Sequence, residues 1–137
     1  MKRADLRRLA QARLADTKAL LDAGQYSGAY YLCGYAIECA IKACIAKQTA
    51  RYDFPDKDKA FKSYTHNPES LIVVAGLRAE LQQEITTDAQ FEVNWEVVIR
   101  WSEHSRYELR SRLEAEDLYR AVTDRRHGVL RWLRQHW

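Results

Sequence analysis

Residues 24–47, GQYSGAYYLCGYAIECAIKACIAK, decide the fold of this chain because they read as one amphipathic helix with several distinct stripes. Small residues recur at helical spacing along one edge, where another helix can approach closely: Ala29, Cys33, Ala36, Ala40 and Cys44. A second stripe follows the same spacing and is aromatic first and then charged: Tyr31, Tyr35, Glu38 and Lys42. The segment therefore predicts a core helix that carries one polar face.

The stripe of Tyr31, Tyr35, Glu38 and Lys42 has two interpretations. In the first, the tyrosines line the rim of the core, and Glu38 and Lys42 form a solvated ion pair that stabilises the helix by about 0.3 kcal/mol. In the second, the four residues form a ligand-binding site with a tyrosine wall, on which bases stack at about 1 to 3 kcal/mol each. The sequence leaves both interpretations open.

Length and composition predict one all-α domain. A chain of 137 residues with 47% hydrophobic content can build one buried core, so we expect a single domain over residues 1–137. Five Gly and two Pro interrupt the chain, and apolar residues fall at periods of three and four. This pattern predicts an up-and-down bundle of four to five helices.

The expected helices are placed by their apolar periodicity and their caps. Gly24 closes the first helix, and Asn67, Pro68 and Glu69 form a clear helix start, which outweighs the β-branched residues that follow as a strand signal. Acidic residues open the last helix and basic residues close it, as the helix dipole favours. The expected ranges are 6–21, 27–47, 68–77, 88–101 and 114–136, with a charged loop at 52–59.

Charge and cysteine content exclude several classes of function. The 22 basic against 19 acidic residues are too mild an excess to predict nucleic acid binding by themselves. Cys33, Cys39 and Cys44 show no metal-binding spacing, so we expect buried free thiols, no metal site and no cofactor. The first residues lack the apolar core of a signal peptide, and no later run approaches a membrane span, so we expect a cytoplasmic protein.

Three segments in order resemble the HEPN domain of prokaryotes, and the resemblance covers nearly the whole chain. They are the second-helix motif AYYLCGYAIECAIKACIA at 29–46, the helix start THNPESL at 65–71, and WSEHSRYE at 101–108, with its pair Arg106 and Tyr107. The resemblance implies a helical bundle that forms homodimers. It also implies a small nucleotidyltransferase as partner, with the HEPN protein as the toxin, and RNA or a nucleotide as ligand.

A subset of HEPN proteins are metal-independent ribonucleases with the signature Arg, four to six residues, then His. The His moves the proton of an RNA 2′-hydroxyl, and the Arg stabilises charge on the phosphate. Here Arg100 and His104 are one residue too close for that signature. Two other pairs satisfy the spacing, Arg120 with His127 and Arg131 with His136, but they fall in the expected last helix and are discounted.

The candidate catalytic residues are therefore Arg100, His104 and Arg106, with His104 as the acid or base. Tyr107 joins the four stripe residues as a ligand-binding candidate. Arg106 is also expected to reach Glu38 across the bundle, as a scaffold contact between a long cation and a carboxylate. His66 is expected to orient its loop, because it precedes a capped helix start.

The sequence is consistent with three functions. The first is a dimeric binding module that works with a nucleotidyltransferase, which the shortened Arg and His spacing favours. The second is a metal-independent endoribonuclease that uses Arg100, His104 and Arg106. The third is a structural interaction protein that holds a partner through Trp132 and Trp137.

Overall fold

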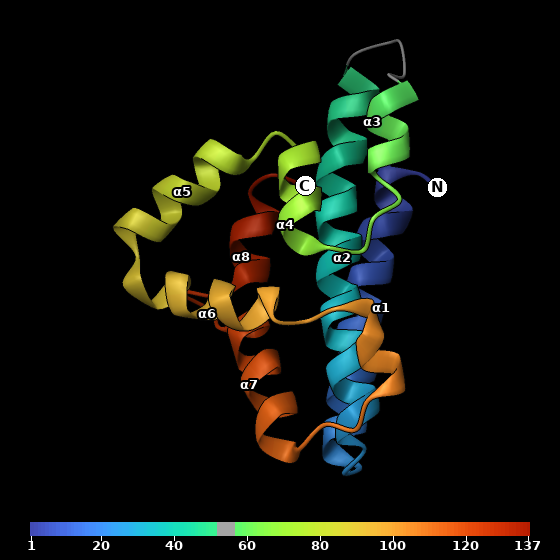
Figure 1. The fold of residues 1–137 in the computed structure, drawn as a ribbon, viewed down its shortest axis with the longest axis vertical. Coiled ribbons are helices and arrows are strands. Elements are labelled where there is room, and N and C mark those ends of the chain that lie inside the picture. Colours follow the sequence, from blue (N-terminus) through green and yellow to red (C-terminus); the bar gives the residue numbers. More distant parts are fainter. Residues whose placement is uncertain (52–56) are drawn as a thin grey trace.

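The computed structural model describes residues 1–51 and 57–137, and regular structure in these ranges is helical throughout, with no strand (Figure 1). The α-helices are α1 (Arg3–Asp22), α2 (Tyr26–Arg51), α3 (Lys57–Lys62), α4 (Pro68–Val74), α5 (Arg78–Thr87), α6 (Ala89–Ile99), α7 (Arg112–Thr123) and α8 (Val129–Arg134), and η1 (Glu103–Tyr107) is a 3-10 helix. The expected all-α class is confirmed.

Helix α2 is the centre of the molecule. It packs along α1 as an antiparallel hairpin and also contacts α4, η1, α7 and α8 (Figure 1). The predicted small-residue edge is buried, with Ala29, Cys33, Ala36 and Ala40 at 0% exposure. Because these side chains are short, neighbouring helices approach α2 closely, and burial of its apolar surface is the main stabilising term of the fold.

The turn between α1 and α2 depends on Gly24. This residue has φ of +73°, a left-handed conformation that a side chain disfavours. The turn closes through a backbone hydrogen bond of 2.8 Å from Gln25 N–H to the carbonyl of Leu20. The predicted end of the first helix at Gly24 is thus confirmed to within two residues.

Two predicted helix starts are also confirmed. The Asn67 side chain accepts a hydrogen bond of 3.1 Å from Ser70 N–H, with Pro68 in the first turn of α4. Asp88 Oδ1 caps α6 by accepting from the backbone N–H of Gln90 and Phe91, each at 3.1 Å. Both caps satisfy N–H groups that have no partner within their own helix.

The expected continuous helix over 114–136 is wrong, because the chain turns between α7 and α8. The Asp124 carboxylate accepts from the backbone N–H of Arg126 and His127, at 2.9 and 2.7 Å, and so favours a turn over a helix. A Cβ at Gly128 would lie 2.3 Å from the carbonyl oxygen of Asp124. Gly128 therefore permits the close turn.

Two short helices were not expected from the sequence. Helix α5 lies on the side of the molecule away from α1 in Figure 1 and leads into α6. Helix α3 begins at Lys57, inside the charged loop expected at 52–59, and the rest of that loop, 52–56, lies outside the described residues. The structure thus has more and shorter helices than the expected four or five.

One helix is long and apolar enough to cross a membrane, although the sequence analysis expected no such segment. Tyr26–Thr49 of α2 is the one such helix among the residues described. In the structure, 72% of its most apolar 18-residue stretch is buried inside the protein. The core helix of a helical bundle is also long, apolar and mostly buried, so these features are weak evidence for a membrane span.

Candidate functional site

Glu38 is a buried carboxylate on the central helix. Its residue exposure is 2%, and its Oε1 accepts a hydrogen bond of 2.8 Å from Lys42 Nζ, one turn later. Its Oε2 is buried and has no hydrogen-bond partner among the described residues. The sequence predicted the pair with Lys42 but not its burial, and a buried charge must be compensated more fully than a solvated one.

His66 supplies a second partner for Glu38. Its Nδ1 lies 2.8 Å from Glu38 Oε1, and its Nε2 lies 3.2 Å from Glu103 Oε2 in η1. A neutral imidazole has one N–H donor, so only the protonated ring donates to both carboxylates at once. His66 therefore links α2, the segment before α4, and η1.

The direct contact predicted between Arg106 and Glu38 is wrong. Among the described residues Glu38 pairs with Lys42 and His66, while Arg106 Nη2 lies 4.0 Å from Glu103 Oε2. The two predicted residues are thus connected indirectly, because His66 and Glu103 lie between them. We call Glu38, Lys42, His66, Glu103 and Arg106 the His66 cluster.

An aromatic row lies beside this cluster on α2. Tyr31 stacks on Tyr35 with ring centroids 6.4 Å apart, and on Trp101 with centroids 6.2 Å apart. Trp101 can lie flat against α2 because position 34 is glycine, where a Cβ would come within 2.2 Å of the indole. Burial raises the pKa of Tyr35, and the nearby Cys39 and Glu38 raise it further. Tyr31 and Tyr35 are half-buried, as the core-rim interpretation requires.

Two hollows adjoin the bridge between Glu38 and His66. The larger, about 450 Å³, is lined by Tyr35, Glu38, Lys42 and Tyr64 together with apolar side chains of α1 and α2. The smaller, about 170 Å³, is lined by Thr65, His66, Asn67, Trp101, Ser102, Glu103 and His104. The bridge therefore contributes a side chain to each hollow.

The remaining predicted residues differ in how they relate to the cluster. His104 is exposed and faces the smaller hollow together with His66. Tyr107 is 78% exposed, and the Arg106 guanidinium lies 5.1 Å from the centre of its ring. Arg100 is exposed at the end of α6 and, in the described part of the chain, forms no ion pair or hydrogen bond with His104 or Arg106.

The sequence reasoning missed Glu103 and assigned His66 only to its loop. Glu103 and Trp101 lie in the segment WSEHSRYE, so their proximity to Arg106 was visible. The contacts of Glu103 with His66 and of Trp101 with Tyr31 depend on how the segment 101–107 folds back along the bundle, and local spacing carries no such signal. His66 is 28 residues from Glu38, which is also beyond any periodic pattern.

His104 and Arg106 are the side chains at this site that are available to act on a ligand. His104 is exposed and forms no hydrogen bond or ion pair with any residue that the structure describes, whereas both nitrogens of His66 already face carboxylates. Arg106 is half-exposed and can exchange its 4.0 Å contact with Glu103 for a phosphate, since such exposed pairs are weak. No group of three or more metal-ligating side chains occurs among the described residues.

The cysteines lie outside this chemistry. All three are free and buried. Burial raises the pKa of Cys39 to about 11 and that of Cys44 to about 12, and it also raises the pKa of Cys33. A thiol with so high a pKa supplies almost no nucleophilic thiolate near neutral pH. The expected role as small core residues is confirmed.

Comparison with known proteins gives one match. The family model described as HEPN domain matches residues 4–135. Neither the curated proteins nor the solved structures that were compared give a match. The family match agrees with the resemblance seen in the segments 29–46, 65–71 and 101–108.

Proposed function

The chain belongs to the HEPN family, and from that premise we propose that it binds a nucleotide unit, free or within RNA, at the His66 cluster. Family membership supports a nucleotide-related, RNA-related or toxin-like role. The observation that carries the proposal is the bridge of 2.8 Å between Glu38 and His66, which joins a hollow lined by Tyr35 to one lined by His104.

The chemistry of the two hollows supports this ligand class. Tyr35 and Tyr64 offer aromatic surface for a base, and stacking contributes about 1 to 3 kcal/mol per base. Arg106 and His104 are exposed beside the smaller hollow and offer hydrogen-bond donors for phosphate oxygens. The bridge itself fixes the two hollows relative to each other, because Glu38 is held by α2.

A titration with a fluorescent mononucleotide tests the proposal. We expect His104→Ala combined with Arg106→Gln to weaken binding at least about tenfold, because two donors to phosphate are lost. The control pair Lys47→Gln with Arg78→Gln removes one positive charge at each of two exposed sites outside both hollows. It should leave the affinity unchanged. Equal affinity in all three proteins would contradict the proposal.

One observation favours a second candidate function, metal-independent cleavage of RNA. His66 and His104 line the same hollow, with Arg106 on the same short helix as His104. In such a reaction, His104 would take the proton of the 2′-hydroxyl as its oxygen attacks the phosphorus, and Arg106 would stabilise the charge on the phosphate. The bond from phosphorus to the 5′-oxygen would break, and that oxygen would take a proton from water. This candidate predicts cleavage in the presence of EDTA, and its loss in His104→Ala. Intact RNA after prolonged incubation with the wild-type protein would exclude the candidate.

We further propose that the protein forms a homodimer and acts as a toxin-like module with a small nucleotidyltransferase. Support comes from the family and from large apolar side chains exposed between the end of η1 and the start of α7, namely Tyr107, Leu109 and Leu113. Light scattering measures the oligomeric state, and Leu109→Asp should convert a dimer to a monomer. Growth arrest on expression, relieved by co-expression of a nucleotidyltransferase from a neighbouring gene, tests the pairing.

A further inference from the structure

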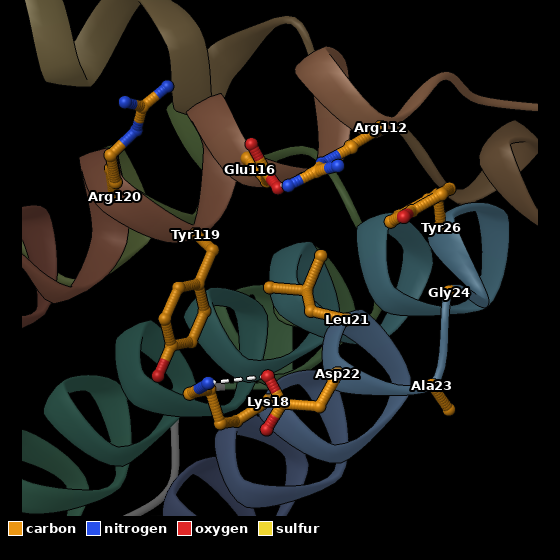
Figure 2. A pocket seen from close by; sticks show the side chains of 10 residues that line it. All are labelled: Lys18, Leu21, Asp22, Ala23, Gly24, Tyr26, Arg112, Glu116, Tyr119 and Arg120. Carbon is orange, nitrogen blue, oxygen red and sulfur yellow. Dashed lines mark hydrogen bonds and ion pairs between the residues drawn. The ribbon is translucent and has the colours of Figure 1, made fainter.

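A groove lined by α1, the start of α2, α7 and α8 shares no lining residue with the two hollows at the His66 cluster. A hollow of about 730 Å³ lies between the C-terminal half of α1, the start of α2, and α7 (Figure 2). A second hollow of about 490 Å³ continues it toward α8, and both are lined by Lys18 and Tyr119. We call the two hollows together the α1–α7 groove.

The lining of the α1–α7 groove is basic. Six basic residues line it, Lys18, Arg112, Arg120, Arg125, Arg131 and Arg134, against three acidic ones, Asp22, Glu116 and Asp124. The difference equals the formal charge of +3 of the whole chain. Two of the six cations, Arg120 and Arg131, pair with Asp117 and Glu84 outside the lining, and the remaining four raise the local attraction for a polyanion.

The cations of the groove are available to a ligand. Lys18 pairs with Asp22 at 2.6 Å and Arg112 with Glu116 at 2.7 Å, but these pairs are exposed and so exchange easily for phosphate oxygens. Arg125 and Arg134 are exposed and form no ion pair with any carboxylate that the structure describes. Arg131, in contrast, is held by Glu84 at 3.0 Å.

Two tyrosines interrupt the charged lining. Figure 2 shows the ring of Tyr119 reaching from α7 toward the pair of Lys18 and Asp22, while Tyr26 lies at the start of α2 below Arg112. Both rings are half-buried, so their positions are fixed while part of each ring stays accessible. A basic groove interrupted by aromatic rings is the surface that single-stranded nucleic acids use, with phosphates on the cations and bases on the rings.

We propose that a single-stranded nucleic acid binds along the α1–α7 groove, with its backbone on Lys18, Arg112, Arg125 and Arg134. The groove follows α1 from Leu14 to its end at Asp22, about 12 Å at 1.5 Å per residue, so it favours a strand over a single nucleotide. This surface is separate from the His66 cluster, and the proposal does not depend on binding there.

Fluorescence anisotropy with a labelled RNA strand of about 12 nucleotides tests the proposal, with DNA of the same sequence, an RNA duplex and a mononucleotide as comparisons. We expect Arg125→Gln combined with Arg134→Gln to weaken strand binding at least about tenfold. The variant should also lower the slope of log affinity against log salt by about 1.4, since each phosphate contact contributes about 0.7 for single strands.

Two further variants make the result interpretable. Lys18→Gln with Arg125→Gln leaves the contact of Arg134 with Trp137 intact and should produce the same loss, so that a folding defect at Trp137 cannot explain it. Lys47→Gln with Arg78→Gln removes two charges outside the groove and should change neither the affinity nor the salt slope. The same losses should occur when His104→Ala and Arg106→Gln are already present, which separates this surface from the His66 cluster.

Each outcome of these titrations either supports or overturns the proposal. Loss of RNA or DNA strand binding in both groove variants, with binding retained in the control, supports the proposal. Unchanged strand affinity in the groove variants or binding of the duplex alone would overturn it, and so would a mononucleotide affinity as high as that of the strand when His104→Ala and Arg106→Gln are already present.

Discussion

Glu38 Oε1 lies 2.8 Å from His66 Nδ1, so a carboxylate buried in the central helix holds the segment that leads into α4. Lys42 donates to the same oxygen at 2.8 Å, and Glu103 Oε2 lies 3.2 Å from Nε2 on the other side of the imidazole. Helix α2, the segment before α4, and η1 are distant in sequence and meet at the imidazole of His66. Removal of the negative charge of Glu38 should therefore affect all three.

Glu38→Gln should lower the free energy of unfolding by about 1 to 2 kcal/mol, because Lys42 and His66 lose their shared anionic partner. Urea denaturation measures this change. Glu96→Gln, at an exposed position of α6, is the matched control and should stay within about 0.5 kcal/mol of wild type. Equal stability of the two variants would show that the bridge does not stabilise the fold.

Double-mutant cycles should rank the contacts of Glu38. We expect a coupling energy of about 0.5 to 1 kcal/mol between Glu38→Gln and His66→Gln, a modest value because His66 is 44% exposed. Between Glu38→Gln and Arg106→Gln the coupling should be smaller, since two residues intervene. A larger coupling for the Arg106 cycle would favour the direct contact that the sequence suggested.

The two glycines of α2 should respond oppositely to alanine. Gly34→Ala places a Cβ 2.2 Å from the Trp101 indole and should cost about 1 to 3 kcal/mol, as overpacking of a core does. Gly28→Ala meets its nearest neighbour, Leu20 Cδ1, at 3.5 Å and should stabilise the helix by about 0.5 to 1 kcal/mol. Thermal unfolding checks both, and stabilisation by Gly34→Ala would contradict the packing of Trp101.

The three thiols should be inert in the folded protein. Burial raises the pKa of Cys39 to about 11 and of Cys44 to about 12, and Cys33 is fully buried. A colorimetric thiol reagent at neutral pH should therefore label none of them before urea is added and all three afterwards. Rapid labelling of the native protein would mean that α2 is accessible.

Much of the fold could be predicted from local patterns, because the signals are local. Periodicity placed α1, α2 and α6, and the cap at Asn67 placed α4, since a capping side chain acts within three residues of its own position. The break between α7 and α8 was missed although Asp124 and Gly128 signal a turn, because the order of acidic and basic residues also fits one continuous helix.

The candidate site could be predicted only in part. Helical spacing alone places Tyr31, Tyr35, Glu38 and Lys42 on one stripe, and the structure keeps them there. The partners from other elements, His66 and Glu103, depend on how the segment before α4 and η1 fold against α2. The basic groove was also invisible in the total charge, because its residues come from α1, α7, α8 and the turn between the last two.

Asp88 should contribute a pH-dependent part of the stability. His127 Nδ1, 2.8 Å from Asp88 Oδ2, is the main cause that lowers the pKa of Asp88 from its ordinary 3.8. A lowered folded-state pKa means that this stability is complete above about pH 3.8 and is lost as the pH falls through the folded value.

Asp88→Asn keeps the cap on α6 but removes the charge that faces His127. Wild type should therefore lose more unfolding free energy than this variant between about pH 5 and about pH 3. Denaturant titrations at several pH values measure the difference. Parallel curves for the two proteins would show that the contact with His127 does not perturb Asp88 in solution.

The most direct test of nucleotide binding at the His66 cluster is an NMR titration that follows the four histidine rings as a mononucleotide is added. His136 packs against Trp132, lines neither hollow of the cluster, and serves as the internal reference. We predict saturable shifts of the His66 and His104 rings with His136 unmoved. Shifts confined to other residues, or no shift of His66 and His104 at saturating nucleotide, would contradict the account.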